Sequence, residues 1–418
     1  MSPPASVLVI CTRRIGDVLL TTPVIRSFRR AWPQAAIDAL VFKGTEGILA
    51  ANPDLRRVLA VPERPGRAAH AAFFAGLLRR YDLAASVIPG DRPTLYACAA
   101  GRRRVGSLVD DAKNRWKRRL LHDWTPFDNL HTHTVLMNLR VAEIAGAEPV
   151  PEVVVAWSPE DEARVASLAP GVAEGRPYAL LHPHPQYAYK QWHATGWSAL
   201  TRWLTAQDLP VVLTGGPGAP ELEYVDALLP NLPAGTLNLA GRLTLAQVGF
   251  LASRARVYVG PDTAVTHIAA ATGIPVVALY GPSNPVKWGP WPRGHRGGNP
   301  FTMRGTQTVG NVTLLQGITD CVPCLEEGCE RHVASLSDCL QHLPAARVIA
   351  AVEAALGGGS GSGSGPGHTH GGSDTPPPAS QAPLLGRRGE FRLPSSHEEG
   401  SAEGRGWCGC SLHSGNSP

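Results

Sequence analysis

Residue 17 is an aspartate among arginines and apolar residues, in the segment CTRRIGDVLLTTPVIRSFRRAWP (residues 11–33). The preceding VLVI run, residues 7–10, is typical of a buried strand. Residues 18–31 carry a helical pattern that ends at Trp32-Pro33, because proline cannot continue a helix. Asp17 is therefore expected at or beside the amino end of a helix, just past the carboxyl end of a strand. From this segment alone, the simplest role for its carboxylate is a helix cap.

A second segment, VYVGPDTAVTHIAAATGIPVVALYGPSNPVKWGPW (residues 257–291), has residue types suited to binding phosphate. A strand ends near Gly260, and Asp262-Thr263 opens a helix whose amino end presents free N–H groups and the positive end of the helix dipole. His267 lies one helical turn after Thr263 and could add a donor at the same opening. The alternative is that Asp262 and Thr263 only cap the helix and that His267 is a satisfied buried histidine.

Two further loops could serve the same chemistry. LHPHPQYAYKQW (residues 181–192) offers Lys190, whose compact ammonium group suits a diphosphate. LTGGPGAPELEYV (residues 213–225) leads from a glycine turn to Glu221 and Glu223, and a carboxylate near a nucleotide can bind ribose hydroxyls. A solvated lysine and ordinary first-turn acids are the alternatives. The chain has neither the G-x-G-x-x-G nor the G-x-x-x-x-G-K-[ST] pattern, which weakens the dinucleotide and P-loop interpretations.

The elements that must position these residues alternate between strand and helix patterns, which predicts an α/β protein with parallel sheets covered by helices on both faces. In residues 1–157 the expected strands are 7–10, 37–42, 58–61 and 84–88, and the expected helices are 18–31, 45–51, 68–80 and 131–145. The pattern then begins again, with strands within 178–183, 211–216, 236–241, 257–262 and 276–281 and helices at 194–206, 221–229, 244–253, 263–272 and 341–356. The polar signals follow the carboxyl ends of strands, where open α/β sheets bind ligands.

Four regions follow from this pattern. We expect an N-terminal domain over residues 1–157, a connection over 158–176 and a C-terminal domain over 177–356. Within the connection, a helix is expected to begin after Ser158, with Pro159 next to it. From residue 357 to 418 the chain is rich in Gly, Ser and Pro, so we expect a disordered low-complexity tail, with no role for Cys408 and Cys410.

Composition limits the compartment and the partners. The 418 residues are 43% apolar, which is adequate for full cores, and no stretch has the length of a membrane-spanning helix or the features of a signal peptide. We therefore expect a cytoplasmic protein with reduced cysteines. The net charge of +5 arises in the first half, where residues 1–157 carry +8, concentrated in GRRRVG (101–106) and KNRWKRRLL (113–121). A solvated face, nucleic acid, or an anionic acceptor or membrane surface would each fit.

The four segments quoted above, taken in their order along the chain, resemble glycosyltransferase family 9, the ADP-heptose:lipopolysaccharide heptosyltransferases, over residues 6–356. The resemblance implies the GT-B architecture, in which two Rossmann-like domains face each other across a cleft. It also implies inverting transfer of heptose from ADP-L-glycero-D-manno-heptose to the lipopolysaccharide inner core. The N-terminal domain would bind the acceptor and the C-terminal domain the ADP-sugar. The enzyme would be cytoplasmic or peripheral on the inner membrane.

The resemblance also implies roles for individual residues. Asp17 would be the general base, since the acceptor hydroxyl must lose its proton as it attacks the anomeric carbon. Lys190 would neutralise the donor phosphates, and Glu221, or Glu223 in its place, would contact the adenosine. The residues expected to line the diphosphate and sugar pocket are Asp262, Thr263, Ala264 and His267. The residues expected to contact the anionic glycolipid acceptor are Arg13, Arg14, Arg102, Arg103 and Arg104.

Two departures from the family pattern affect the donor pocket. His184-Pro185-Gln186 stands where family members often carry small or hydroxyl residues and an arginine, and Ala264 stands where glycine is frequent. No cofactor is implied, and dependence on a divalent cation is left open.

Four cysteines have the spacing C-x2-C-x4-C-x9-C, namely Cys321, Cys324, Cys329 and Cys339. They are interpreted either as a structural zinc site, with His332 as a possible replacement ligand, or as reduced structural or redox-active thiols. Three further functions are alternatives to the leading one. The chain could act on another glycan or protein acceptor, it could be a relative that binds sugar nucleotide without catalysis, or it could be a zinc-containing nucleic-acid-binding protein. The last leaves the second-half motifs without a purpose.

Overall fold

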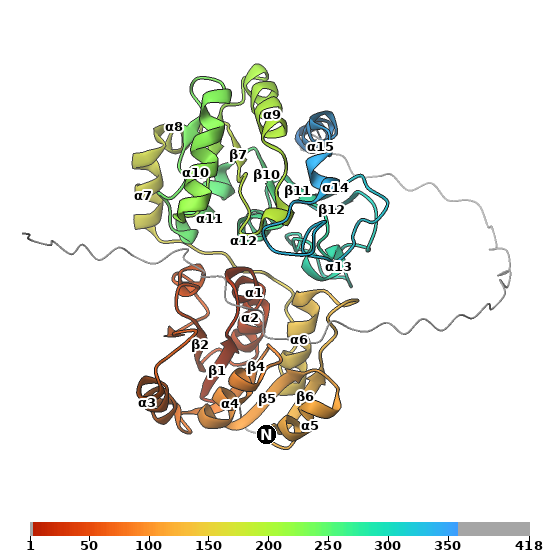
Figure 1. The fold of residues 1–418 in the computed structure, drawn as a ribbon. Coiled ribbons are helices and arrows are strands. Elements are labelled where there is room, and N and C mark those ends of the chain that lie inside the picture. The colour runs from red at the N-terminus through yellow and green to blue at the C-terminus, as the bar shows by residue number, and fades with distance from the viewer. Residues whose placement is uncertain (1–2, 358–418) are drawn as a thin grey trace, which may run out of the picture.

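The computed structural model describes residues 3–357. The predicted tail lies outside this range apart from Gly357, and so do Cys408 and Cys410. Two α/β domains are stacked one on the other, with α1 and α2 of the first facing α12 and α13 of the second (Figure 1). Among the described residues, no helix is long and apolar enough to cross a membrane.

The N-terminal domain is built on a six-stranded parallel sheet in the order β3-β2-β1-β4-β5-β6. Its strands are β1 (Ser6–Cys11), β2 (Ala36–Phe42), β3 (Arg57–Val61), β4 (Tyr81–Ser86), β5 (Gly101–Leu108) and β6 (Asp123–Pro126). Its helices are α1 (Ile15–Leu19), α2 (Thr22–Ala31), α3 (Arg67–Leu77), α4 (Asp91–Ala100), α5 (Arg115–Arg118) and α6 (Thr134–Ala145), with 3-10 turns η1 (Glu46–Leu49) and η2 (Ala112–Asn114).

The C-terminal domain has a seven-stranded sheet in the order β12-β13-β11-β10-β7-β8-β9, parallel except for the β12–β13 pair. Its strands are β7 (Ala179–Leu181), β8 (Val211–Leu213), β9 (Leu237–Asn238), β10 (Val257–Pro261), β11 (Val276–Tyr280), β12 (Gln307–Val309) and β13 (Val312–Gln316). Its helices are α7 (Pro159–Leu168), α8 (Pro170–Ala173), α9 (Ala194–Ala206), α10 (Ala219–Leu228), α11 (Leu245–Arg254), α12 (Ala264–Thr272), α13 (Pro285–Trp288), α14 (Asp338–Gln341) and α15 (Ala345–Gly357), with η3 (Ala188–Lys190) and η4 (Leu229–Asn231).

The helix expected over residues 18–31 is two helices, α1 and α2, and it begins earlier than expected. Pro23 has no N–H to donate to the carbonyl of Leu19, so the helix breaks just before it. Two threonine hydroxyls supply the missing donors: Thr22 Oγ1 donates to the Leu19 carbonyl at 2.7 Å, and Thr21 Oγ1 donates to the Asp17 carbonyl at 2.9 Å. The break leaves α1 as a separate short helix at the carboxyl edge of the sheet.

The segment expected to connect the domains belongs to the C-terminal domain. Residues 158–176 contain α7 and α8, whose Val165 and Val172 lie in the C-terminal core. The predicted helix start is confirmed, because Ser158 is the N-cap and forms a capping box with Asp161. The chain instead passes between the cores around residues 153–157, where Val155 packs on the first core and Trp157 on the second.

A buried carboxylate ties three strands of the first sheet together. Asp38 on β2 is fully buried and accepts hydrogen bonds from Arg56 at 2.7 and 2.9 Å, from Arg57 at 2.8 Å and from the Tyr81 hydroxyl at 2.6 Å. Burial alone would raise the pKa of Asp38, but these donors outweigh it and hold the pKa below its usual value. The carboxylate therefore links β2 to β3 and β4 as an ion.

The two domains share apolar surface. Leu245 of α11 and Ile268 of α12 are buried in the core cluster of the N-terminal domain. Leu20, at the break between α1 and α2, shares a second cluster with Trp288 and Trp291 of the C-terminal domain. This packing fixes α1, which carries Asp17, against the elements that carry the other candidate residues.

Candidate active site

Asp17 lies in the first turn of α1, directly after the carboxyl end of β1. It is not the cap of that helix, since the N-cap is Arg14 and no side chain caps the helix. The carboxylate of Asp17 is half-buried and makes no hydrogen bond or ion pair with another residue in the range 3–357. A carboxylate held without a donor is available to accept a proton from a substrate.

Burial raises the pKa of Asp17, and four cations act against that rise: Arg13, Arg14, Lys287 and Lys190. The first two flank it on its own turn, and the two lysines come from the other domain. A carboxylate whose pKa is raised is a stronger base than an ordinary one. The electrostatic setting of Asp17 therefore suits proton abstraction.

Helix α12 brings His267 next to the base. Helices α1 and α12 are in contact, and a Cβ atom placed on Gly16 would lie 3.9 Å from His267 Cδ2. Burial lowers the pKa of His267 to about 4, so the imidazole is neutral at physiological pH. Its Nδ1 is buried and has no hydrogen-bond partner among the described residues. His267 thus faces the site with a ring nitrogen available for a ligand.

The amino end of α12 has the form expected from the sequence. Thr263 is the N-cap, and its Oγ1 accepts a hydrogen bond from the Thr266 backbone N–H at 3.4 Å. Ala264 is the first residue of the helix. The first-turn N–H groups of a helix have no partner within the helix, so this end can take an anionic group.

Lys190 and Asp262 form an ion pair at the same opening. Lys190 Nζ lies 2.6 Å from Asp262 Oδ2, and their side chains are 20% and 7% exposed. Burial alone would raise the pKa of Asp262, but Lys190 leads the charges that outweigh it, so the pKa lies below its usual value. Asp262 also accepts a hydrogen bond from the Tyr280 hydroxyl at 3.3 Å. The carboxylate therefore holds the ammonium group of Lys190 beside the amino end of α12.

Of the two glutamates on α10, only Glu221 faces the glycine turn. Its carboxylate accepts a hydrogen bond from the Gly216 N–H, and burial raises its pKa, whereas Glu223 is exposed. A Cβ atom on Gly216 would come within 2.6 Å of that carboxylate, so a side chain at this position would displace Glu221. The geometry favours Glu221 over Glu223 as the residue that could meet a ribose.

The segment that departs from the family pattern packs at this side of the site. The His184 ring lies 5.1 Å from the Tyr224 ring, Pro185 is buried and Gln186 is exposed. Burial lowers the pKa of His184, and its Nδ1 is buried without a partner among the described residues. A neutral histidine there offers a hydrogen bond in place of a cation.

The arginines expected to contact the acceptor fall into two groups. Arg13 and Arg14 lie beside Asp17, and the Arg14 guanidinium stands 5.0 Å from the centre of the Tyr187 ring in the other domain. The Arg102–Arg104 run opens strand β5, at the edge of the sheet opposite to Asp17. The structure therefore does not bring Arg102, Arg103 and Arg104 to the base.

These three arginines have structural contacts where they lie. Arg102 pairs with Asp82 at 3.2 Å, and Arg103 donates to the carbonyls of Ile144 and Ala145, each at 2.8 Å, at the end of α6. A cation beside the last carbonyls of a helix is favourable. Arg103 thus stabilises α6, which carries part of the domain contact.

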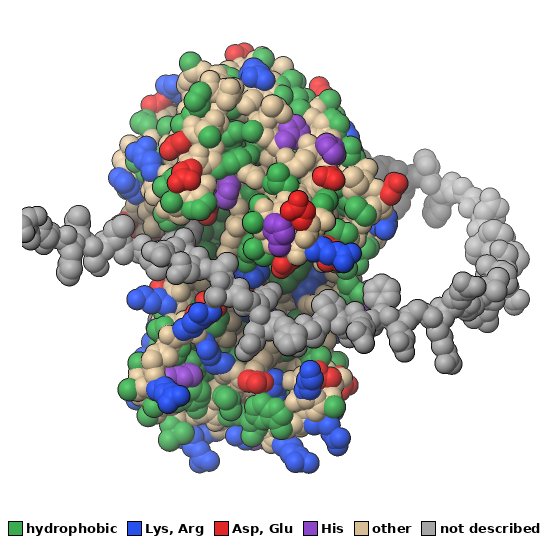
Figure 2. All heavy atoms as spheres, in the orientation of Figure 1, with side chains coloured by type: hydrophobic (Ala, Val, Ile, Leu, Met, Phe, Trp, Pro, Cys, Tyr) green, Lys and Arg blue, Asp and Glu red, His purple; other side chains and the backbone are tan. Residues whose placement is uncertain are grey.

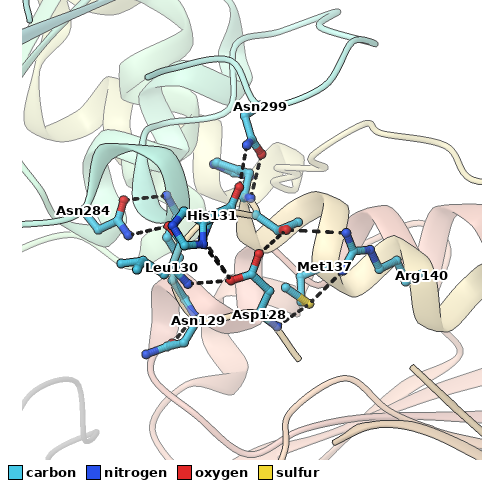
Figure 3. A network of polar contacts seen from close by, with 11 residues as sticks. Asp128, Asn129, Leu130, His131, Met137, Arg140, Asn284 and Asn299 are labelled. Carbon is cyan, nitrogen blue, oxygen red and sulfur yellow. Dashed lines mark hydrogen bonds and ion pairs between the residues drawn. The ribbon is translucent and has the colours of Figure 1, made fainter. Parts of the chain in front are cut away.

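Sequence reasoning missed the contact loop of the N-terminal domain, residues 127–134, and its partners on the other domain (Figure 3). Asn284 Nδ2 donates to the Leu130 carbonyl at 2.9 Å. Asn299 accepts from the His133 N–H at 2.9 Å and donates to the His131 carbonyl at 2.7 Å. We call this set of hydrogen bonds the interdomain clasp.

Lys287 is the further residue that the sequence did not single out. It lies on α13 and its Nζ donates to Asn129 Oδ1, a residue of the contact loop. The only sequence signal was a lone lysine in an apolar, Gly- and Pro-rich stretch after a strand, NPVKWGPW. Its neighbours come from the other domain, so its position could not be read from the sequence.

The cysteine cluster holds no metal site in the described range, where no group of three or more ligand side chains is placed to bind an ion. Cys321, Cys324 and Cys329 are exposed, Cys339 is buried, and all are free thiols. The structure therefore does not support the zinc interpretation. Burial and the neighbouring cysteines raise the pKa of Cys339 to about 12, which leaves it an inert thiol.

Solved structures share this arrangement of two domains. Glycosyltransferase family 9 protein from Veillonella parvula superposes with a TM-score of 0.67 at 18% identity, over 84% of this chain and 97% of that one. The ADP-heptose lipopolysaccharide heptosyltransferase II of Escherichia coli superposes with a TM-score of 0.63 at 20% identity, over 85% of this chain and all of that one. The fold is therefore that of the GT-B glycosyltransferases.

Sequence comparisons find similarity to one family of glycosyltransferases. The model of glycosyltransferase family 9 (heptosyltransferase) matches residues 97–297. Lipopolysaccharide heptosyltransferase 3 of Escherichia coli is 28% identical over 66% of this chain and 83% of its own length. Lipopolysaccharide heptosyltransferase 1 of Pseudomonas aeruginosa is 27% identical over 77% of this chain and 87% of its own. The chain is thus similar to glycosyltransferase family 9 over these residues, and it is a glycosyltransferase.

Proposed function

We propose that this chain is an inverting heptosyltransferase that moves heptose from ADP-L-glycero-D-manno-heptose onto the inner core of lipopolysaccharide. The observation that carries the proposal is the free, half-buried carboxylate of Asp17, which faces the Lys190 ammonium and the amino end of α12 from the opposite domain. The names of the relatives supply the sugar and the acceptor class.

The proposed reaction is a single displacement. Asp17 takes the proton of the acceptor hydroxyl as that oxygen attacks the anomeric carbon, while ADP leaves from the other face. General-base help of this kind is worth about 10²–10⁴-fold in rate. Lys190 and the first-turn N–H groups of α12 stabilise the charge on the leaving diphosphate, and they are in place before the reaction.

The other site residues would orient the donor. Glu221 would bind hydroxyls of the adenosine ribose at the turn around Gly216. His267 offers its free Nδ1 to the sugar or to a phosphate oxygen, and Asp262 holds Lys190 in position. No metal or other cofactor enters this scheme.

We also infer where the acceptor meets the protein. Arg13 and Arg14 stand beside the base and suit the anionic groups of a lipopolysaccharide core. Basic side chains also gather at the lower end of the N-terminal domain in Figure 2, and the exposed residues of this domain include Arg102, Lys113, Arg115 and Arg119. That surface would contact the anionic cytoplasmic face of the inner membrane rather than the reacting hydroxyl.

The experiment is ADP release by the purified full chain with ADP-heptose and a panel of core oligosaccharides truncated at successive sugars. ADP release on one truncated core, with the product heavier by one heptose, is the expected result. Binding of ADP-heptose without ADP release on any core would favour another acceptor or a non-catalytic relative. Failure to bind ADP-heptose would overturn the donor assignment.

A further inference from the structure

The loop that carries Lys190 contacts the N-terminal domain through a pair of tyrosines. Tyr187 and Tyr189 stack on each other, with their ring centres 5.5 Å apart and their planes at 8°. The guanidinium of Arg14, from the N-terminal domain, lies over the Tyr187 ring, 5.0 Å from its centre. Lys190 Nζ lies 6.0 Å from the centre of the Tyr187 ring and 5.7 Å from that of the Tyr189 ring. The two rings therefore stand between a cation of one domain and a cation of the other.

The backbone of this loop links the position of Tyr187 to that of Lys190. Tyr187 is the N-cap of η3, and Lys190 is the last residue of that turn. The Lys190 N–H donates to the Tyr187 carbonyl at 3.0 Å, the i to i+3 hydrogen bond that defines a 3-10 turn. A contact that fixes Tyr187 therefore also fixes the point from which the Lys190 side chain starts.

The far end of Lys190 is held by Asp262, whose Oδ2 lies 2.6 Å from Nζ. A lysine side chain is long and flexible, and it loses conformational freedom when a ligand immobilises it. A lysine that is held in place beforehand loses less freedom on binding, so its ligand binds more tightly. The loop and Asp262 together hold Lys190 in this way.

Arg14 belongs to the turn that carries the candidate base. It is the N-cap of α1, three residues before Asp17. A guanidinium within about 6 Å of a tyrosine ring centre is attracted by the negative face of the ring. The turn that carries the base is therefore in attractive contact with the loop that carries the candidate phosphate-binding lysine.

We propose that Arg14 is a positioning residue for donor binding: through its contact with Tyr187 it fixes the loop that presents Lys190 to the donor diphosphate. The proposal rests on the function proposed above, and it gives Arg14 a role in the donor site besides its proposed contact with the acceptor. The acceptor-binding domain would then raise the affinity for the donor diphosphate through a residue that does not touch it.

The C-terminal domain also holds this loop with contacts of its own. The Ala188 N–H donates to the Val333 carbonyl at 3.2 Å, and Gln341 Nε2 donates to the Gln191 carbonyl at 2.7 Å. If these contacts were sufficient to fix the loop, removing the Arg14 guanidinium would leave the affinity for the donor unchanged.

A second alternative is that Arg14 acts only as a positive charge near a site for an anion. Arg13 is the matched comparison, because it is the neighbouring residue, carries the same charge and is also exposed. The guanidinium that lies over the Tyr187 ring is that of Arg14. If charge alone mattered, the two arginines would have similar effects on the affinity for the donor, and neither effect would depend on Tyr187.

The test is a double-mutant cycle on the affinity of the full chain for ADP and for inorganic diphosphate, measured by isothermal titration. Arg14→Gln should raise both dissociation constants by roughly two- to fivefold, the effect of one cation–π contact. In a Tyr187→Leu background, Arg14→Gln should have no further effect, because the contact is already lost. Tyr187→Phe keeps the ring and should bind both ligands like wild type.

The control is Arg13→Gln, which removes the same charge from the neighbouring position. Its effect on ADP affinity should be smaller than that of Arg14→Gln, and it should be the same with Tyr187 present as in the Tyr187→Leu background. Equal losses in Arg13→Gln and Arg14→Gln, each additive with Tyr187→Leu, would overturn the proposal in favour of charge alone. Unchanged ADP affinity in Arg14→Gln would overturn it in favour of a loop that the C-terminal domain fixes by itself.

Turnover separates this proposal from the proposed function. With a core oligosaccharide that wild type extends, Tyr187→Leu should raise the KM for ADP-heptose and leave kcat nearly unchanged, whereas a general structural defect would lower kcat. If the chain binds ADP but transfers no heptose, the proposed function fails and the binding cycle still decides this proposal. If heptose is transferred but Arg14 and Tyr187 show no coupling in the cycle, this proposal alone fails.

Discussion

Lys190 Nζ lies 2.6 Å from Asp262 Oδ2 in the domain proposed to bind the donor. The pair forms where the carboxyl end of β10 meets α12, so the ammonium already lies at the helix end that is proposed to bind the donor phosphates. An arriving diphosphate adds a second anion to Lys190, and Asp262 keeps the lysine from turning to solvent.

Replacing Lys190 should weaken donor binding more than acceptor binding. Lys190→Gln removes a charge-assisted hydrogen bond, which contributes about 1.5–3 kcal/mol, so the dissociation constant of ADP should rise about 10- to 100-fold. Isothermal titration of ADP measures it. The matched control is Lys113→Gln, exposed in η2, which should bind ADP like wild type. Equal ADP affinity in Lys190→Gln and wild type would contradict the assignment.

Glu221 and Glu223 offer a comparison within one helix. Glu221→Gln removes the carboxylate that lies on the Gly216 N–H and should reduce affinity for ADP by about tenfold, the effect of one hydrogen bond to a charged group. Glu223→Gln changes an exposed side chain two positions beyond and should have no effect. Titration with ADP and with inorganic diphosphate separates a contact with the adenosine from a contact with the diphosphate. In Glu221→Gln only the affinity for ADP should fall. A loss of diphosphate affinity would place Glu221 elsewhere in the pocket.

The pH profile should show the raised pKa of Asp17. The base acts as the carboxylate, so kcat/KM falls as the pH drops through its pKa. Because burial raises that pKa, the acid limb should lie above about 4, the value of an ordinary aspartate. Stopped assays across pH 4 to 8, with pre-incubation controls for stability, give the profile. An acid limb at or below the ordinary value would contradict the electrostatic description of the site.

Asp38 should make the N-terminal domain sensitive to acid. Its pKa is lower in the folded chain than in the unfolded one, so its contribution to stability is present above about pH 4 and is lost as pH falls through the folded-state value. Asp38→Asn breaks a buried ion pair and should lower the free energy of unfolding by about 3–5 kcal/mol at pH 7. Urea unfolding at pH 7 and at low pH measures both effects. Asp226→Asn, on the exposed face of α10, is the control and should change little.

Lys287→Met should give a more stable protein. The pKa of Lys287 falls from 10.5 to about 8 on folding, which corresponds to a cost of about 3 kcal/mol below pH 8. The unfolded chain binds the proton more readily, so this cost disappears as pH rises from 8 to above 10.5. Thermal unfolding at pH 7 should show a higher midpoint in Lys287→Met. A lower midpoint would mean that the ammonium group stabilises the domain contact.

Much of the C-terminal domain could be predicted from the sequence because its strands and helices carry strong local patterns. Helix α9 occupies the expected residues 194–206. Helix α12 begins at Ala264, one residue after the expected start, because Thr263 is its N-cap. Lys190 and Asp262 were expected in the site because ligand-binding residues gather at the carboxyl ends of parallel strands. The ion pair between them was not foreseen.

The rest depended on contacts between residues far apart in the chain. Strand β5 was missed because it opens with Arg102–Arg104, which look like a solvated basic patch, yet the strand is paired on both sides by β4 and β6. The clasp joins Leu130 to Asn284, and Lys287 donates to Asn129; both pairs are more than 150 residues apart. No local pattern encodes such pairs, so Lys287 could be recognised only from the structure.

The central claim is that Asp17 is the base for transfer between the two domains. The most direct test compares ADP release by wild type and Asp17→Asn, with and without the core oligosaccharide that wild type extends. Binding of ADP-heptose to both proteins shows that the variant is folded. We expect acceptor-dependent ADP release in wild type, reduced by about 10²–10⁴-fold in Asp17→Asn with unchanged donor affinity. Equal rates in the two proteins would contradict the account.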